Sequence, residues 1–171
     1  MNPVETRLTE AMLEFAARQA HFMNDRDAEA FAPAIIAFRA ELDTAAEAGV
    51  ERWQAWHLVS TSITDPEDRL YCLRRVLATL QAERPNPVGA DNPRIIATHK
   101  ILRAQCLVQM AEIHRQQGRC DEARECYERA LSFARATSDI ADDAAVTGSG
   151  LMNIEGRIAA ALLTLDAEGE S

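Results

Sequence analysis

The segment LVQMAEIHRQQGRCDEARECYERAL, residues 107–131, decides the fold of this chain. Small or apolar residues recur in it at helical spacing, at Leu107, Met110, Ala111 and His114 and then at Ala123, Tyr127, Ala130 and Leu131. Gly118 stands between the two sets, where a glycine can form the left-handed turn that ends a helix. The segment therefore predicts a helical hairpin whose two faces close on each other.

A weaker copy of this hairpin lies 54 residues upstream, where EDRLYCLRRVL (67–77) aligns with DEARECYERAL (121–131). The alignment pairs Cys72 with Cys126, Leu73 with Tyr127, Arg75 with Arg129 and Leu77 with Leu131, and in the preceding helices Trp53 with Leu107 and Trp56 with Met110. Each hairpin has an apolar edge that it cannot bury alone, so neighbouring hairpins are expected to stack. The end helices are then expected to cap the stack with a polar outer face.

The remaining chain is also helical in pattern, and no segment has strand periodicity. Asn2 with Pro3 and Glu5 forms a helix start with a capping box, and Asp65 with Pro66 forms another start. Pro33 indicates either a kink or a short separate helix. The predicted helices cover about 2–23, 27–48, 50–63, 65–84, 92–117, 121–137 and 139–165, with a break near 148–150, a loop at 85–92 and a frayed tail at 166–171. We therefore expect an all-α chain of about seven helices.

Residues 105–138 resemble a tetratricopeptide repeat, most closely the longer variant found in kinesin light chains and bacterial signal-sensing regulators. The residues that carry the resemblance are Leu107, Ala111, Gly118, Ala123, Tyr127, Ala130 and Leu131. Ala111 and His114 stand where the family usually has glycine and tyrosine. The resemblance implies a single domain over 1–165, a short right-handed solenoid with a weak repeat at about 50–83, a strong repeat at about 105–138 and capping helices at both ends.

The family geometry implies a concave groove lined by the first helix of each hairpin. The corresponding residues are Glu51, Gln54, Leu58 and Thr61 in the weak repeat and Gln105, Val108, Gln109, Glu112 and Arg115 in the strong one. The Lys and Asn residues with which some family members clamp a terminal carboxylate are missing there. A mixed apolar and amide groove suits an extended or helical peptide segment. The alternative is that these residues are only solvated, or that they pack against a terminal helix.

The charge of the chain is unevenly distributed around a net value of −9. Residues 1–51 hold ten acids and four arginines, and residues 136–171 hold seven acids and one arginine, so each end carries −6. Residues 52–135 hold ten acids and thirteen bases, giving +3. A basic patch is formed by Arg69, Arg74, Arg75, Arg84, Arg94, Lys100 and Arg103. It is either a docking surface for an acidic partner or a solvated face, and the acidic total argues against nucleic acid as a partner.

Cysteines and histidines do not form a ligand pattern in this sequence. Cys72, Cys106 and Cys126 are expected as buried free thiols, and His57 and His114 as structural residues. Asp142-Asp143 and Gly148-Ser149-Gly150 offer no completed metal or nucleophile motif. No signal peptide and no membrane span is recognisable. We therefore expect a cytoplasmic, reduced protein with no metal or cofactor, no membrane association and no enzymatic activity.

These features predict an adaptor that binds a protein or peptide partner in a concave helical groove or through the basic patch. Two alternatives remain open from the sequence: a chaperone for a secreted bacterial protein, which its size and acidity resemble, and a regulatory domain that senses a peptide or small ligand. Homo-oligomer formation is also left open. The sequence does not identify the partner or the pathway.

Overall fold

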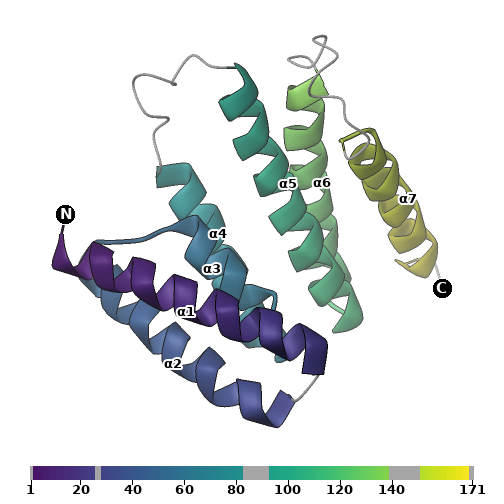
Figure 1. Cartoon of the computed structure of the whole chain (residues 1–171). Helices are drawn as coiled ribbons and strands as arrows, with labels where there is room; N and C mark the ends of the chain where they lie inside the picture. The colour runs from purple at the N-terminus through teal and green to yellow at the C-terminus, as the bar shows by residue number, and fades with distance from the viewer. Residues whose placement is uncertain (1, 26–27, 83–92, 139–150, 170–171) are drawn as a thin grey trace. The chain divides into compact units, whose positions relative to one another are not determined.

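The computed structural model describes residues 2–25, 28–82, 93–138 and 151–169, and these residues form seven helices and no strand (Figure 1). The all-α expectation is therefore confirmed for this part of the chain. The helices are α1 (Pro3–Asp25), α2 (Ala28–Glu47), α3 (Trp53–Ser60), α4 (Pro66–Ala82), α5 (Pro93–Gln116), α6 (Cys120–Ser138) and α7 (Leu151–Gly169). The right-handed solenoid remains a prediction.

Two helices, α3 and α7, differ from their expected bounds by three or more residues at an end, and α2 differs in having no break. α3 begins only at Trp53, because Arg52 has an extended backbone (φ −133°, ψ 122°). α2 runs without interruption through Pro33, which lies near its start and removes one intrahelical hydrogen bond. α7 continues to Gly169, so four residues of the expected frayed tail are helical.

The predicted caps of α1 and α4 are present. Val4 N–H donates to Asn2 Oδ1 (3.1 Å) and Asp68 N–H donates to Asp65 Oδ1 (2.8 Å), so each cap satisfies one of the amides left free at a helix start. The Glu5 carboxylate, expected to complete a capping box, instead accepts a hydrogen bond from Arg52 (2.7 Å). It therefore ties α1 to the segment before α3.

Gly118 ends α5 in the way that the sequence predicts. Its φ is +72°, its N–H donates to Arg115 O (3.0 Å), and the N–H of Arg119 donates to His114 O (2.9 Å). This pair of bonds closes the helix in a Schellman motif, which requires the left-handed conformation that glycine adopts without strain. Gly49, with φ +74°, ends α2 in the same way.

The chain divides into two compact units, Met1–Thr79 and Leu80–Ser171. In the first unit α1 packs against α2, and the Phe15 ring stacks on Phe38 with centroids 4.5 Å apart. Trp56 of α3 is 1% exposed; it meets Tyr71 edge-on and lies under the Arg75 guanidinium. The predicted single domain over 1–165 remains a prediction.

In the second unit α5 and α6 form the predicted hairpin, and α7 packs against α6. Leu107, Ala111, Ala123 and Ala130 are fully buried. Alanines let two helix backbones approach closely, because their side chains add little width at the contact. The Arg157 guanidinium of α7 also pairs with Glu112 of α5 at 3.5 Å.

The burial pattern repeats at the offset of 54 residues seen in the sequence. Residues buried at both positions are Trp56 and Met110, Val59 and Ile113, Ser60 and His114, Cys72 and Cys126, Leu73 and Tyr127, Val76 and Ala130, and Leu80 and Ala134. Seven aligned positions are therefore buried in both copies, although α3 has 8 residues and α5 has 24. The match is partial: Ala55, Leu70 and Leu77 are buried only in the first copy, and Leu107, Ala111 and Ala123 only in the second.

Candidate functional site

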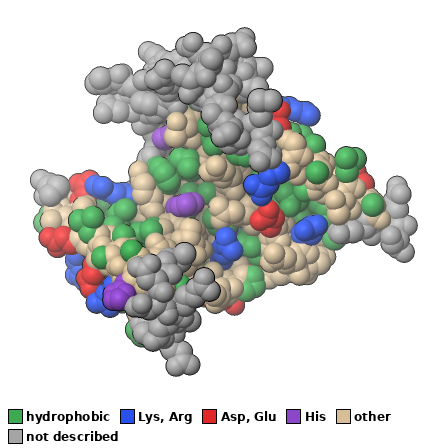
Figure 2. Space-filling view, turned by 45° about the vertical axis from the view of Figure 1, so that its right-hand side comes forward, with side chains coloured by type: hydrophobic (Ala, Val, Ile, Leu, Met, Phe, Trp, Pro, Cys, Tyr) green, Lys and Arg blue, Asp and Glu red, His purple; other side chains and the backbone are tan. Residues whose placement is uncertain are grey.

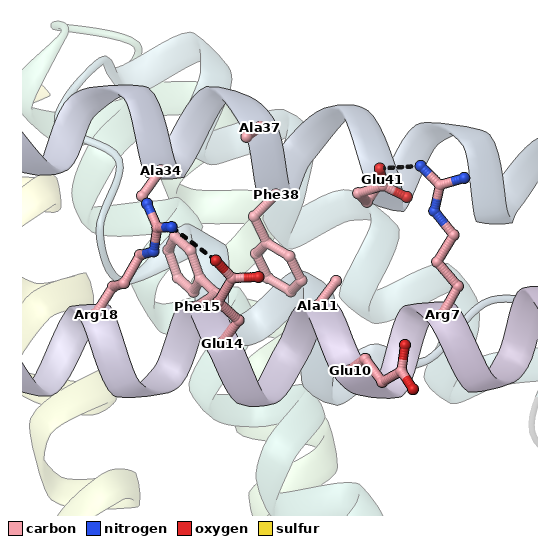
Figure 3. Close-up of a pocket in the computed structure, with 10 residues that line it drawn as sticks. All are labelled: Arg7, Glu10, Ala11, Glu14, Phe15, Arg18, Ala34, Ala37, Phe38 and Glu41. Atoms are coloured by element: carbon pink, nitrogen blue, oxygen red, sulfur yellow. Dashed lines mark hydrogen bonds and ion pairs between the residues drawn. The ribbon is translucent and has the colours of Figure 1, made fainter.

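The first unit has a groove between α1 and α2, with a cavity volume of about 310 Å³. Its lining residues are Arg7, Glu10, Ala11, Glu14, Phe15 and Arg18 from α1 and Ala34, Ala37, Phe38 and Glu41 from α2 (Figure 3). The sequence analysis treats these two helices as capping helices and does not predict a groove there. We refer to this site as the α1–α2 groove.

The α1–α2 groove is hollow because small residues lie between long ones. Ala11, Ala34 and Ala37 have only a methyl group where the two helices face each other, and the stacked rings of Phe15 and Phe38 lie beneath them. On α1 the lining positions recur every three or four residues, which places them on one face of the helix. The floor is therefore apolar and built on two stacked aromatic rings.

The rim of the α1–α2 groove consists of two ion pairs with the aromatic rings between them (Figure 3). Arg7 pairs with Glu41 at 2.5 Å, and this hydrogen bond is the main cause of a raised pKa at Arg7. Arg18 pairs with Glu14 at 2.6 Å, one helical turn away on α1. The Arg18 and Glu14 side chains are 59% and 67% exposed, and exposed pairs of this kind contribute only about 0.3–0.5 kcal/mol. A ligand can therefore exchange this second pair at little cost.

Glu10 is the remaining charged residue of the rim. It is exposed, and it has no ion pair within the part of the chain that the structure describes. It lies one turn from Glu14 on the same helix, so the two carboxylates are neighbours along the rim. The rim thus presents three carboxylates against two guanidinium groups.

The predicted groove residues of the weak repeat lie on or beside α3. Gln54 is exposed and Leu58 half-buried, whereas Glu51 pairs with Arg75 of α4. The Thr61 hydroxyl accepts a hydrogen bond from the Gln19 amide of α1 (2.9 Å). The alternative reading, packing against a terminal helix, therefore describes Thr61.

The predicted groove residues of the strong repeat all lie on α5. Gln105 and Arg115 are exposed, and Val108 and Gln109 are half-buried. Glu112 is ion-paired to α7 through Arg157. These residues belong to the second unit and those on α3 to the first, so a groove common to both sets remains a prediction.

Several members of the predicted basic patch take part in contacts inside the protein. Arg75 pairs with Glu51, the Lys100 ammonium donates to Ala136 O (3.1 Å), and the Arg103 guanidinium donates to Leu80 O while lying over the Phe133 ring. Figure 2 shows blue and red side chains scattered among green ones on the displayed face. The patch as a docking surface remains a prediction.

The other patch residues differ in exposure. Arg74 is exposed and Arg69 is half-buried. Arg84 and the side chain of Arg94 lie outside the described residues, as do the 85–92 loop, Asp142-Asp143 and Gly148-Ser149-Gly150.

The titratable residues singled out in the sequence have structural surroundings. His57 is half-buried against the Trp53 ring, and burial lowers its pKa. Burial raises the pKa of Cys72 to about 11 and that of Cys106 to about 12. Among the described residues no three His, Cys, Asp or Glu side chains come together as a metal site. The buried thiols agree with the expected packing role.

The exposed surface of α7 includes one apolar stripe, whereas a capping helix is expected to have a polar outer face. Gly156, Ala160 and Ala167 are exposed along it, and Leu163 is 71% exposed. They recur at intervals of three and four residues, opposite the buried Ile158 and Leu165 side. Arg157, Thr164 and Asp166 are exposed beside this stripe, so the exposed surface of α7 is mixed.

Comparison with known proteins gives no relative: no family model matches the chain, and neither the curated proteins nor the solved structures include a match. None of the described helices combines the length and the apolar character needed to cross a membrane.

Proposed function

We propose that the protein is a non-enzymatic interaction module made of helical hairpins and that the α1–α2 groove receives a segment of a partner protein. The observation that carries this proposal is the groove itself, with its apolar floor and fixed charges of both signs at its rim. Ligand sites commonly combine an apolar hollow with a few polar groups that fix orientation.

The repeated pattern of buried residues in the two predicted hairpins supports the same class of function. Their burial pattern recurs at 54 residues, as in proteins that stack one helical unit on the next and use the resulting surfaces for binding. We extend the proposal to a tetratricopeptide-like solenoid for the same reason. A polypeptide partner fits the chain better than a nucleic acid because the net charge is −9.

We also propose that the protein is cytoplasmic. Cys72, Cys106, Cys120 and Cys126 are all free thiols. Free thiols of this number are typical of a reducing compartment, and they support the proposed cytoplasmic location.

Filling the groove tests the proposal. Ala37 lines the groove, whereas Ala40 is exposed on the same helix and does not. Peptides selected on the wild-type protein from a random library should lose affinity for Ala37→Trp at least tenfold and keep it for Ala40→Trp, as measured by fluorescence anisotropy. Circular dichroism checks that both variants are folded.

The proposal fails in either of two cases. The selection can yield no peptide that binds, or the selected peptides can bind Ala37→Trp as tightly as Ala40→Trp. In the second case the binding surface lies elsewhere on the protein.

A further inference from the structure

We infer that the segment bound in the α1–α2 groove is a basic amphipathic helix, which lays apolar side chains over the floor and brings a lysine or arginine to Glu10. This inference rests on the proposed function and adds the chemistry of the partner. The shape and the charge of the groove both favour this occupant.

The two walls of the groove favour a helical partner. Both walls are α-helices, and the structure describes no strand whose edge could pair with an extended peptide. A groove between two helices is filled by the apolar face of a third helix, with anchor residues three or four positions apart. The floor offers methyl groups at Ala11, Ala34 and Ala37 for such anchors.

The α1–α2 hairpin as a whole is acidic. α1 carries four acids and two arginines, and α2 carries four acids and one arginine, so the two helices together have a net charge of −5. A partner helix with basic residues is attracted to this surface, and an acidic one is repelled. The hairpin therefore favours a cationic ligand before any contact forms.

The charges at the rim also favour a cationic partner, and they indicate where its positive charge would lie. At the rim, Arg7 and Arg18 are already paired with Glu41 and Glu14. Glu10 has no such pair among the described residues, and it is exposed. A basic side chain one turn from an apolar anchor would extend toward Glu10 while its anchor covers Phe15, because Glu10 and Phe15 are five residues, or about 7.5 Å, apart along α1 and a lysine or arginine side chain is long.

Three synthetic peptides of equal length and helix propensity test the inference with the full chain. The first has a leucine stripe and lysines one turn away, the second has glutamates for the lysines, and the third has serines for the leucines. We expect the first to bind by fluorescence anisotropy and the other two to bind at least tenfold more weakly. Glu10→Gln should weaken the first peptide by about two- to fivefold, the range of an exposed ion pair.

The control for Glu10→Gln is Glu47→Gln, which removes an exposed acid of α2 outside the groove. If both variants weaken the lysine peptide equally, Glu10 has no special part and the inference fails. If the glutamate peptide binds as well as the lysine peptide and Ala37→Trp still blocks both, the inference fails while the proposed function stands.

Two further results would overturn the inference. Sedimentation equilibrium can find a wild-type dimer that Ala37→Trp dissociates, which would place a second copy in the groove. No binding by any of the three peptides, together with selected peptides insensitive to Ala37→Trp, would remove the proposed function as well.

Discussion

Replacing Gly118 by alanine should destabilise the protein, whereas the same replacement at Gly156 should stabilise it. Gly118 has φ +72° at the turn between α5 and α6, while Gly156 lies in the interior of α7 without a positive φ. Both glycines belong to the unit Leu80–Ser171, so one unfolding transition can report on both. The chemical change is identical, and only the backbone conformation differs.

The magnitude at Gly118 follows from two terms, the strain of the folded backbone and the entropy of the unfolded chain. A Cβ built at this position meets nothing within 4 Å, so no steric clash adds to the effect. A left-handed conformation costs an L-residue about 1–2 kcal/mol. The alanine also reduces the freedom of the unfolded chain, which returns about 0.4–1 kcal/mol. The expected net loss in the free energy of unfolding is about 1 kcal/mol.

At Gly156 the change to alanine is expected to raise the free energy of unfolding rather than lower it. A Cβ there also meets nothing within 4 Å, and the residue is exposed in a helix. Alanine is favoured over glycine in a helix interior by about 0.5–1 kcal/mol. The two variants should therefore differ by about 1.5–2 kcal/mol, or roughly 3–8 °C in Tm for a chain of this size.

Urea unfolding followed by far-UV circular dichroism measures both changes. Gly118→Asn serves as an additional control, because asparagine tolerates the left-handed region better than alanine and should lose less stability. The reasoning is refuted at the turn if Gly118→Ala leaves the free energy of unfolding unchanged or raises it. It is refuted at α7 if Gly156→Ala destabilises, since the added methyl would then meet a neighbour.

Three further predictions concern the core, the thiols and a cap. Trp56→Ala should lower the free energy of unfolding by about 3–5 kcal/mol in a denaturant titration, because it removes a fully buried ring; a loss under 1 kcal/mol would contradict the packing. In the native protein at pH 8 a disulfide reagent should react rapidly only with Cys120, because Cys120 is exposed. Burial raises the pKa of Cys72 to about 11 and that of Cys106 to about 12, which lowers the thiolate fraction of both residues. Rapid reaction of a second thiol, detected by mass spectrometry, would disprove this. Asp65→Ala should cost about 1 kcal/mol in thermal unfolding and Asp65→Asn much less, because asparagine keeps the capping oxygen; equal losses would exclude the cap.

The helices and their ends could be predicted largely from the sequence. The 3.6-residue period, the turn at Gly118 and the cap at Asp65 all depend on residues within one or two turns of each other. The start of α3 could not be predicted in this way. Arg52 is held extended while its side chain binds Glu5, which lies 47 residues earlier in the chain.

The α1–α2 groove was missed for a related reason. Its signal on α1 is present in the sequence as Arg7, Ala11, Glu14 and Arg18, spaced along one helical face. The hollow appears only when that face lies opposite the alanines of α2. Periodicity in the sequence identifies the faces of each helix but does not predict which face of another helix each one packs against.

The sequence by itself determined that this chain is helical and where most helices begin and end, because these properties follow from local hydrogen bonding and side-chain period. Only the tertiary structure decided which charges are already paired and where a hollow remains. Arg75 and Arg103 have their partners inside the protein, whereas Glu10 has none among the described residues. Ion pairs and cavities depend on distances between helices, and those distances are set by how side chains from separate segments fit together.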